Sequence, residues 1–219
     1  EGNPFPLEKL PLAIALSAVI VLAVALALGA LGYVRSGEQA RTGTEVVTGV
    51  SSPVDVIWTD RAVPHVWAGG LEDAVFAQGF LHARDRLWQM ELVRRAIQGR
   101  LAEVMGEPAL GTDRFMRRIG LWEAARAGVD SLTRGERTVL QAYADGVNAA
   151  IEGWDGPLPP EFLVLGFEPE PWEPVHTLAV AKMMSYTLAA YGESVAVARA
   201  LRSLPEERVR WLFPEFREW

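Results

Sequence analysis

The stretch Phe-Leu-His-Ala-Arg-Asp-Arg-Leu-Trp-Gln-Met-Glu, residues 80–91, lies inside the strongest periodic pattern of the chain. Apolar side chains recur there at steps of three and four, which is the spacing of one face of an α-helix. We therefore predict a helix of about eight turns, bent near Gly99. The apolar positions of this face are Phe76, Phe80, Ala83, Leu87, Met90, Ile97, Leu101 and Val104.

Charged residues interrupt this helix in two groups. Glu91 is spaced to reach Arg94 at i+3 and Arg95 at i+4, and Arg84 to Arg86 form a second group on the preceding turns. Such charges typically form a solvated or internally paired network, and this interpretation is favoured over a direct catalytic role.

Short extended segments precede the helix. Residues 54–59 and 64–68 are rich in β-branched and aromatic side chains, residues 60–62 separate them, and Gly69-Gly70 ends the second. This pattern predicts a hairpin or two strands at the edge of a sheet.

Capping and breaking signals organise the region after the helix. Thr133 and Glu136 have the spacing of a capping box, which predicts a helix start that leads to a stop at Gly153. Prolines predict loops at 156–160 and 168–174. A helix is expected over 175–188, and a final helix restarts at Leu204-Pro205.

The N-terminal segment, residues 1–34, contains a long apolar run. From Leu10 to Val34 no side chain ionises except that of Tyr33. A helix of this length reaches roughly 37 Å, enough to cross the hydrocarbon layer of about 30 Å. A buried core helix would keep a polar stripe, which this run lacks. A cleaved signal peptide, with small residues near Ala25 to Ala30, is the other alternative, and an uncleaved signal anchor is favoured.

Composition narrows what the remaining chain does. Residues 35–52 are polar and predict a linker, so the folded part is expected over 53–219. The 219 residues are 50% hydrophobic, which is typical of a globular chain, and the net charge of -7 disfavours nucleic-acid binding. Without cysteine there is no disulfide, zinc–thiolate site or thiol nucleophile. The three histidines, His65, His82 and His176, lack the spacing of metal ligands.

The 80–91 stretch, continued through Arg94-Arg95 and Gly99-Arg100-Leu101-Ala102-Glu103, closely resembles the helix signature of the penicillin acylase family. Residues 60–66 and 73–79, together with Asp113-Arg114 and Arg118-Ile119-Gly120, fit the same pattern, so the resemblance covers roughly 54–213. It implies an α+β class: a mainly helical α chain of a four-layer αββα N-terminal-nucleophile hydrolase fold, completed by a separate β chain.

The resemblance also implies a reaction. Members of the family hydrolyse the amide bond of N-acyl substrates after a precursor cuts itself into α and β chains. The nucleophile is the serine at the start of β, and its own α-amine acts as base. No serine follows Ser203. The expectation is therefore that this chain is the α part, without catalytic residues of its own, in an exported, membrane-anchored heterodimer located in the periplasm or otherwise outside the cytoplasm.

Substrate-binding and metal residues are implied by the same resemblance. The segment that borders the acyl pocket in relatives corresponds to Met184, Tyr186, Thr187 and Leu188. Leucine replaces the aromatic residue of the phenylacetyl-preferring branch, which implies a preference for aliphatic acyl groups. Core packing of Met184 and Leu188 is the alternative. Relatives bind a structural calcium ion through one α-chain glutamate; Glu193 corresponds to it after a one-residue gap, and an exposed loop glutamate is the alternative.

The natural substrate stays open between β-lactam side chains such as that of penicillin, acyl-homoserine lactones and other N-acyl amines. A different class of function is a membrane-anchored, non-catalytic interaction protein or a truncated acylase relative. A chain that needs a β partner is also expected to expose the apolar face that carries Phe76, Phe80, Leu87 and Met90, and to aggregate alone.

Overall fold

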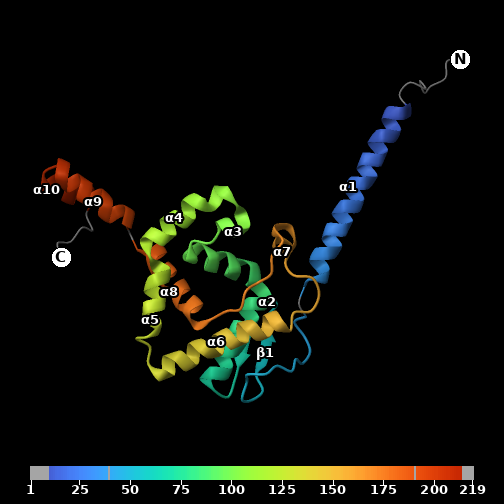
Figure 1. Cartoon of the computed structure of the whole chain (residues 1–219), viewed down its shortest axis with the longest axis horizontal. Helices are drawn as coiled ribbons and strands as arrows, with labels where there is room; N and C mark the ends of the chain where they lie inside the picture. The colour runs from blue at the N-terminus through green and yellow to red at the C-terminus, as the bar shows by residue number, and fades with distance from the viewer. Residues whose placement is uncertain (1–9, 39, 190, 214–219) are drawn as a thin grey trace.

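The computed structural model describes residues 10–38, 40–189 and 191–213 of the chain. Its centre is α2 (Leu71–Gln98), which lies against α6 (Arg134–Glu152), while α1 (Leu10–Ser36) projects away from the helical body (Figure 1). Two glycines allow α2 and α6 to approach so closely. A Cβ at Gly79 would lie 2.2 Å from the carbonyl oxygen of Tyr143, and one at Gly146 would lie 1.9 Å from that of Phe76. The backbones therefore touch where these helices cross.

The predicted long helix is confirmed, but its predicted bend near Gly99 is wrong. Gly99 ends α2 instead, because it adopts a left-handed conformation (φ 65°, ψ 43°) and donates its N–H to the carbonyls of Ala96 and Arg95. The helix departs from helical geometry at Arg86 (φ -140°, ψ 22°). The last apolar positions of the pattern, Leu101 and Val104, therefore lie beyond α2.

The apolar face of α2 is covered within this chain, so the expectation that it is exposed was wrong. Phe76 and Leu87 are 2% and 4% exposed, and Phe80 and Met90 are partly buried. Side chains of α6 and of the segments after it supply the other half of this core: Ala144, Val147, Ala150, Phe162 and Trp172.

The predicted hairpin is confirmed as β1 (Asp55–Trp58) and β2 (Pro64–Trp67), which pair antiparallel with Asp55 opposite Trp67. Within the described residues this two-stranded sheet is the whole of the β structure. Ile57 and Trp67 remain largely exposed, so one face of the hairpin is uncovered.

Helices complete the rest of the body. The predicted capping box begins α6: Glu136 donates its N–H to Thr133 Oγ1 (3.3 Å), and the Glu136 carboxylate accepts from the Thr133 N–H (2.7 Å). The remaining elements are α3 (Ala102–Met105), the 3₁₀ turn η2 (Glu107–Ala109), α4 (Leu110–Ile119), α5 (Leu121–Val129), α7 (Pro160–Leu165), α8 (Pro174–Leu188), α9 (Tyr191–Ser203) and α10 (Glu206–Leu212).

The N-terminal apolar run forms α1. Over Ile14–Ser36 the helix is long and apolar enough to cross a membrane, and none of its most apolar window is buried against the body. A signal sequence near the N-terminus can meet the same criteria of length and hydropathy.

Candidate functional site

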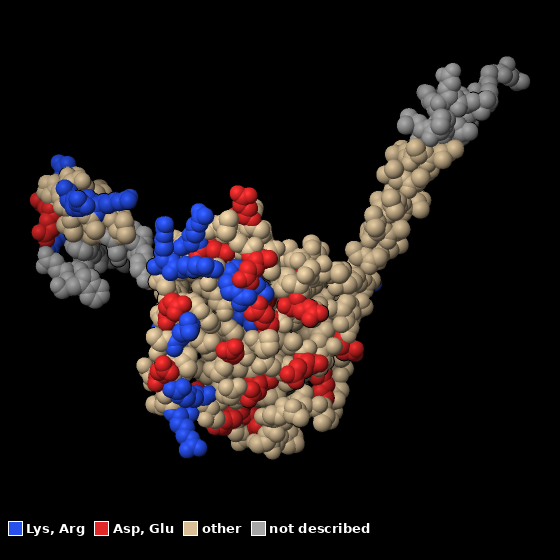
Figure 2. Space-filling view, in the orientation of Figure 1, with Lys and Arg blue, Asp and Glu red and all other residues tan. Residues whose placement is uncertain are grey.

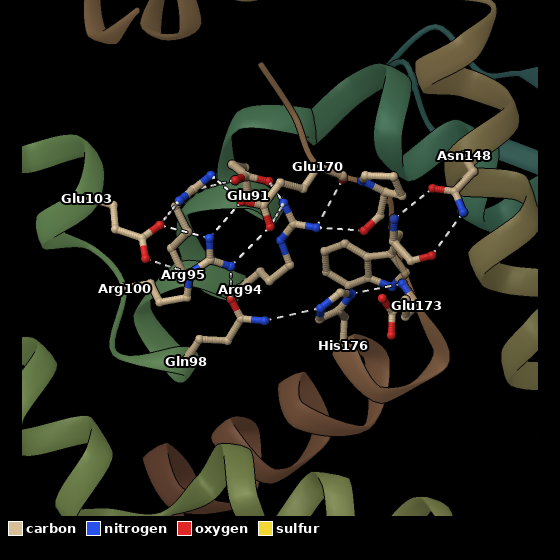
Figure 3. A network of polar contacts seen from close by, with 12 residues as sticks. Glu91, Arg94, Arg95, Gln98, Arg100, Glu103, Asn148, Glu170, Glu173 and His176 are labelled. Atoms are coloured by element: carbon tan, nitrogen blue, oxygen red, sulfur yellow. Dashed lines mark hydrogen bonds and ion pairs between the residues drawn. The ribbon is translucent and has the colours of Figure 1, made fainter. Parts of the chain in front are cut away.

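A buried charge network joins α2 to the loop that leads into α8 (Figure 3). Glu91, which is 3% exposed, forms ion pairs with Arg94 and, at 2.6 Å, with Arg95 Nε. These are the i+3 and i+4 pairs that the sequence predicts. Because all three side chains are buried, each charge depends on its partners rather than on water.

Glu170 links this group to a distant part of the chain. Its carboxylate accepts from Arg95 (2.9 Å) and Arg100 (2.8 Å), and the Arg94 guanidinium donates to the backbone carbonyls of Glu170 (3.0 Å) and Pro171 (2.9 Å). The hydrogen bond from Arg100 lowers the pKa of Glu170 to about 2, so this carboxylate is ionised at neutral pH. Glu103 closes the outer side of the network on Arg95 and Arg100.

His176 fixes the first turn of α8. Its Nδ1 accepts the N–H of Glu173 (2.8 Å), its Nε2 lies 3.2 Å from the side-chain amide of Gln98, and its ring stacks on Trp122. Burial, reinforced by the positive charge of Arg94, lowers the pKa of His176 to about 4. The ring is therefore neutral at pH 7, and it serves as a hydrogen-bond acceptor inside the fold.

The loop before α8 is held from a third side. Asn148 of α6 donates to the carbonyl of Trp172 (2.9 Å) and accepts its N–H (2.7 Å), and Trp172 Nε1 donates to Thr177 (2.9 Å). The network, His176 and this backbone pair thus fix the start of α8 on α2 and α6. Because α8 is one continuous helix from Pro174 to Leu188, fixing its first turn also positions the residues at its C-terminal end.

The predicted substrate-binding residues occupy that other end of α8. Met184 is 52% and Leu188 77% exposed, while Tyr186 is half-buried and Thr187 donates its hydroxyl to the carbonyl of Met184 (3.0 Å). Met184 and Leu188 are therefore not core residues of this chain. The helix ends here because Ala189 leaves the helical region with ψ 132°. The arrangement presents apolar and hydroxyl groups together on one exposed helix end.

The predicted calcium ligand, Glu193, belongs to α9, and its side chain lies outside the described part of the structure. No group of three or more His, Cys, Asp or Glu side chains that could hold a metal ion is found among the described residues.

The other two histidines, His82 and His65, lie in different elements. His82 Nδ1 is 2.8 Å from the hydroxyl of Tyr143, whose pKa burial raises to about 12. His65 sits in β2 opposite Ile57. Sequence patterns did not indicate the contribution of Glu170, because its partners Arg95 and Arg100 are at least 70 residues away in the chain.

A separate hollow of about 920 Å³ lies between residues 40–58 and α2. Phe76, Phe80 and Arg84 line its helical side, and none of the residues 184–188 borders it. Ser51 and Ser52 are fixed beside it because both donate side-chain and backbone hydrogen bonds to Asp73. The hollow and the end of α8 are thus different surfaces.

Comparisons with known proteins show which family this chain resembles. The family model for penicillin amidase matches residues 53–218. Penicillin acylase 2 proenzyme of Pseudomonas sp. strain SE83 is 41% identical over 149 residues, which are 68% of this chain and 19% of that protein. Acyl-homoserine lactone acylase QuiP of Pseudomonas aeruginosa is 32% identical over 176 residues, 80% of this chain and 21% of that protein.

The match with a solved structure covers a much larger share of the other chain. Thermostable penicillin G acylase from Alcaligenes faecalis matches with a TM-score of 0.55 and 26% identity, and the match covers 74% of this chain and 90% of that chain. This chain spans about a fifth of the length of the curated relatives.

Proposed function

Because this chain belongs to the penicillin amidase family, we propose that it is the α part of an acylase that hydrolyses the amide bond of N-acyl substrates. The main support for this proposal is the share of each relative's length that this chain matches. The match with this chain spans 19% of a penicillin acylase proenzyme but 90% of one chain in a solved penicillin G acylase. That difference is what a precursor cut into a smaller and a larger chain produces.

In this proposal the larger β chain supplies the nucleophile. Its N-terminal serine oxygen attacks the amide carbonyl and the serine α-amine takes the hydroxyl proton. The amine of the substrate leaves with that proton, and water then hydrolyses the acyl ester. The part of this chain is to shape the acyl pocket, with the start of α8 held by Glu170, Arg94 and His176.

We propose a preference for aliphatic acyl groups, supported by the exposed Leu188 at the end of α8. A flexible aliphatic wall adapts to linear chains and lacks the flat face that an aromatic ring would offer to phenylacetyl. The whole protein should hydrolyse hexanoyl or octanoyl amides with a higher kcat/KM than phenylacetyl amides. Faster hydrolysis of the phenylacetyl amide would refute this preference.

The variant Leu188→Phe tests the role of this residue. It should shift the ratio of kcat/KM toward phenylacetyl by about tenfold, the scale on which hydrophobic pockets discriminate. Leu110→Phe, at an exposed position of α4, is the control and should leave the ratio unchanged. An equal response of both variants would show that Leu188 does not border the acyl pocket.

We also propose that Glu193 supplies one oxygen ligand to a structural calcium ion whose other ligands come from the β chain. A carboxylate is a suitable hard donor, and one carboxylate alone does not make a site. Metal analysis of the whole protein should find one calcium ion, and Glu193→Gln should weaken its retention during dialysis. Full retention in this variant would argue against the assignment.

The third part of the proposal is the location. We propose that residues 10–34 anchor the protein in a membrane and that its body lies outside the cytoplasm. The side chains of residues 14–32 support this, because they carry no charge and are exposed, with no part of the described chain covering them. Extraction of the protein from membranes by detergent but not by salt or alkaline carbonate is the expected behaviour.

A further inference from the structure

The end of α1 is fixed directly to the body. Tyr33, three residues before the helix ends, donates its hydroxyl to the carbonyl of Leu158 (2.9 Å). The backbones also approach closely on the same side. A Cβ at Gly37 would lie 3.0 Å from the carbonyl oxygen of Pro157, and one at Gly156, where φ is +83°, would lie 2.8 Å from that of Ser36. The apolar helix therefore leaves the body at residues 156–158.

Two apolar side chains lie just beyond this exit. Helix α7 begins at Pro160, two residues after Leu158, and it lies beside the foot of α1 (Figure 1). Its Leu163 and Val164 are 67% and 80% exposed, whereas Phe162 on the opposite side of the helix is buried in the core. We call Leu163 and Val164 the α7 patch. Figure 2 shows the surface beside the foot of α1 as largely uncharged.

The charged residues around the α7 patch indicate which force could hold it against a membrane. Glu161 and Glu168 flank it in the sequence, and both are acidic, so these residues do not attract the patch to anionic lipid headgroups. Burial of apolar surface is the remaining driving force. Tyr33, at the end of the apolar run, has the amphipathic ring that is enriched where a spanning helix meets the membrane–water interface. Leu158 accepts the hydrogen bond of Tyr33 and lies two residues before α7. The start of α7 is therefore at the same level, the membrane–water interface.

We propose that the α7 patch inserts into the interfacial layer of the bilayer that α1 spans, as a second membrane contact of the body. Apolar side chains of interfacial helices reach about 5–10 Å into this layer. With α1 fixed at residues 156–158 and α7 resting on the lipid, the body keeps one orientation above the membrane. The inference rests on the proposed membrane anchor, since the patch meets lipid only if α1 spans it.

Spin labelling tests this contact in the full-length protein reconstituted in phosphatidylcholine vesicles. The chain has no cysteine, so Leu163→Cys and Val164→Cys each place one label on it, and any cysteine in the rest of the protein is replaced. Collisions with oxygen report lipid, and collisions with a water-soluble nickel chelate report water. We expect an oxygen-to-nickel ratio several-fold above that of a label at the exposed Ser131 in the loop between α5 and α6.

Two results at the patch would overturn the proposal. High nickel accessibility would place Leu163 and Val164 in water, and low accessibility to both reagents would place them beneath another protein surface. A label at Ala23 on α1 separates failure of the premise from failure of the inference. If Ala23 is in lipid and the patch is not, the anchor stands and the second contact is wrong; if Ala23 is in water, the anchor fails too.

Discussion

Glu91 is the residue on which the buried charges of α2 depend. It is buried between Arg94 and Arg95, so Glu91→Gln leaves two buried cations with one carboxylate fewer. Removing one partner of a buried ion pair costs about 3–5 kcal/mol. We expect the urea midpoint of the assembled protein to fall accordingly. In the exposed pair of Glu123 and Arg126, the control Glu123→Gln should cost about 0–1 kcal/mol. Equal midpoints for the two variants would contradict a stabilising network.

His176 gives the fold a defined response to acid. Burial holds its pKa at about 4, below the value of 6.5 that applies in the unfolded chain. Between these values the unfolded state binds one proton more than the folded state, so stability is full above pH 6.5 and falls as the pH drops toward 4. The loss approaches about 3 kcal/mol.

The pH effect of His176 is separable from that of Glu170. The pKa of Glu170 is lowered from 4.5 to about 2, so its contribution is present above pH 4.5 and disappears only as the pH falls toward 2. His176→Asn retains an acceptor for the N–H of Glu173. This variant should be less stable at pH 7, but its urea midpoint should change less between pH 6.5 and 4.5 than that of the unsubstituted protein. If the midpoint of the variant changes with pH as steeply as before, other titratable groups cause the pH dependence of stability.

At this scale the sequence predicts pairs that are close in the chain and misses those that are not. The i+3 and i+4 spacing indicated the pairs of Glu91 with Arg94 and Arg95, which the structure confirms. Glu170 could not be assigned, because only the fold brings its proline-rich loop to Arg95. The role of His176 was not predicted either, because Gln98 and Trp122 reach it only through the fold, although its pair with Glu173 is local.

At the scale of elements, the crossing of α2 and α6 depends on glycine. A methyl group at Gly146 would overlap the carbonyl oxygen of Phe76. Gly146→Ala should therefore destabilise by about 1–3 kcal/mol or more through overpacking. Gly135→Ala in the same helix has open space around it and should stabilise by up to about 1 kcal/mol. Thermal unfolding of both variants checks the prediction; a stabilising Gly146→Ala would show that the helices do not approach so closely.

Local signals predicted some elements and not others. The capping box of Thr133 and Glu136 gave the start of α6, and the residue pattern gave the hairpin and α8. The end of α2 was misplaced because apolar spacing continues past Gly99, where the left-handed backbone stops the helix. Helices α4 and α5 were not predicted, and α7 begins where proline had indicated only a loop.

At the scale of the whole molecule, the sequence alone could not show which apolar surfaces this chain covers by itself. The α2 face, expected to await a partner, is covered by α6. Ile57 and Trp67 on the hairpin and Met184 and Leu188 on α8 are among the apolar groups that stay exposed instead. These surfaces lie on different elements, so a partner that covers them must be large. The proposed β chain meets this requirement.

The assignment of this chain as the α part of an acylase depends above all on its partner. N-terminal sequencing of the proteins that co-purify with the chain, from the membranes of cells that make it, identifies that partner. We expect a larger second chain, encoded downstream in the same precursor, whose first residue is serine. If the chain is isolated alone, or still joined to the downstream part of an uncut precursor, and nevertheless hydrolyses N-acyl amides, the assignment is wrong. A larger partner that begins with another residue would contradict the proposed nucleophile.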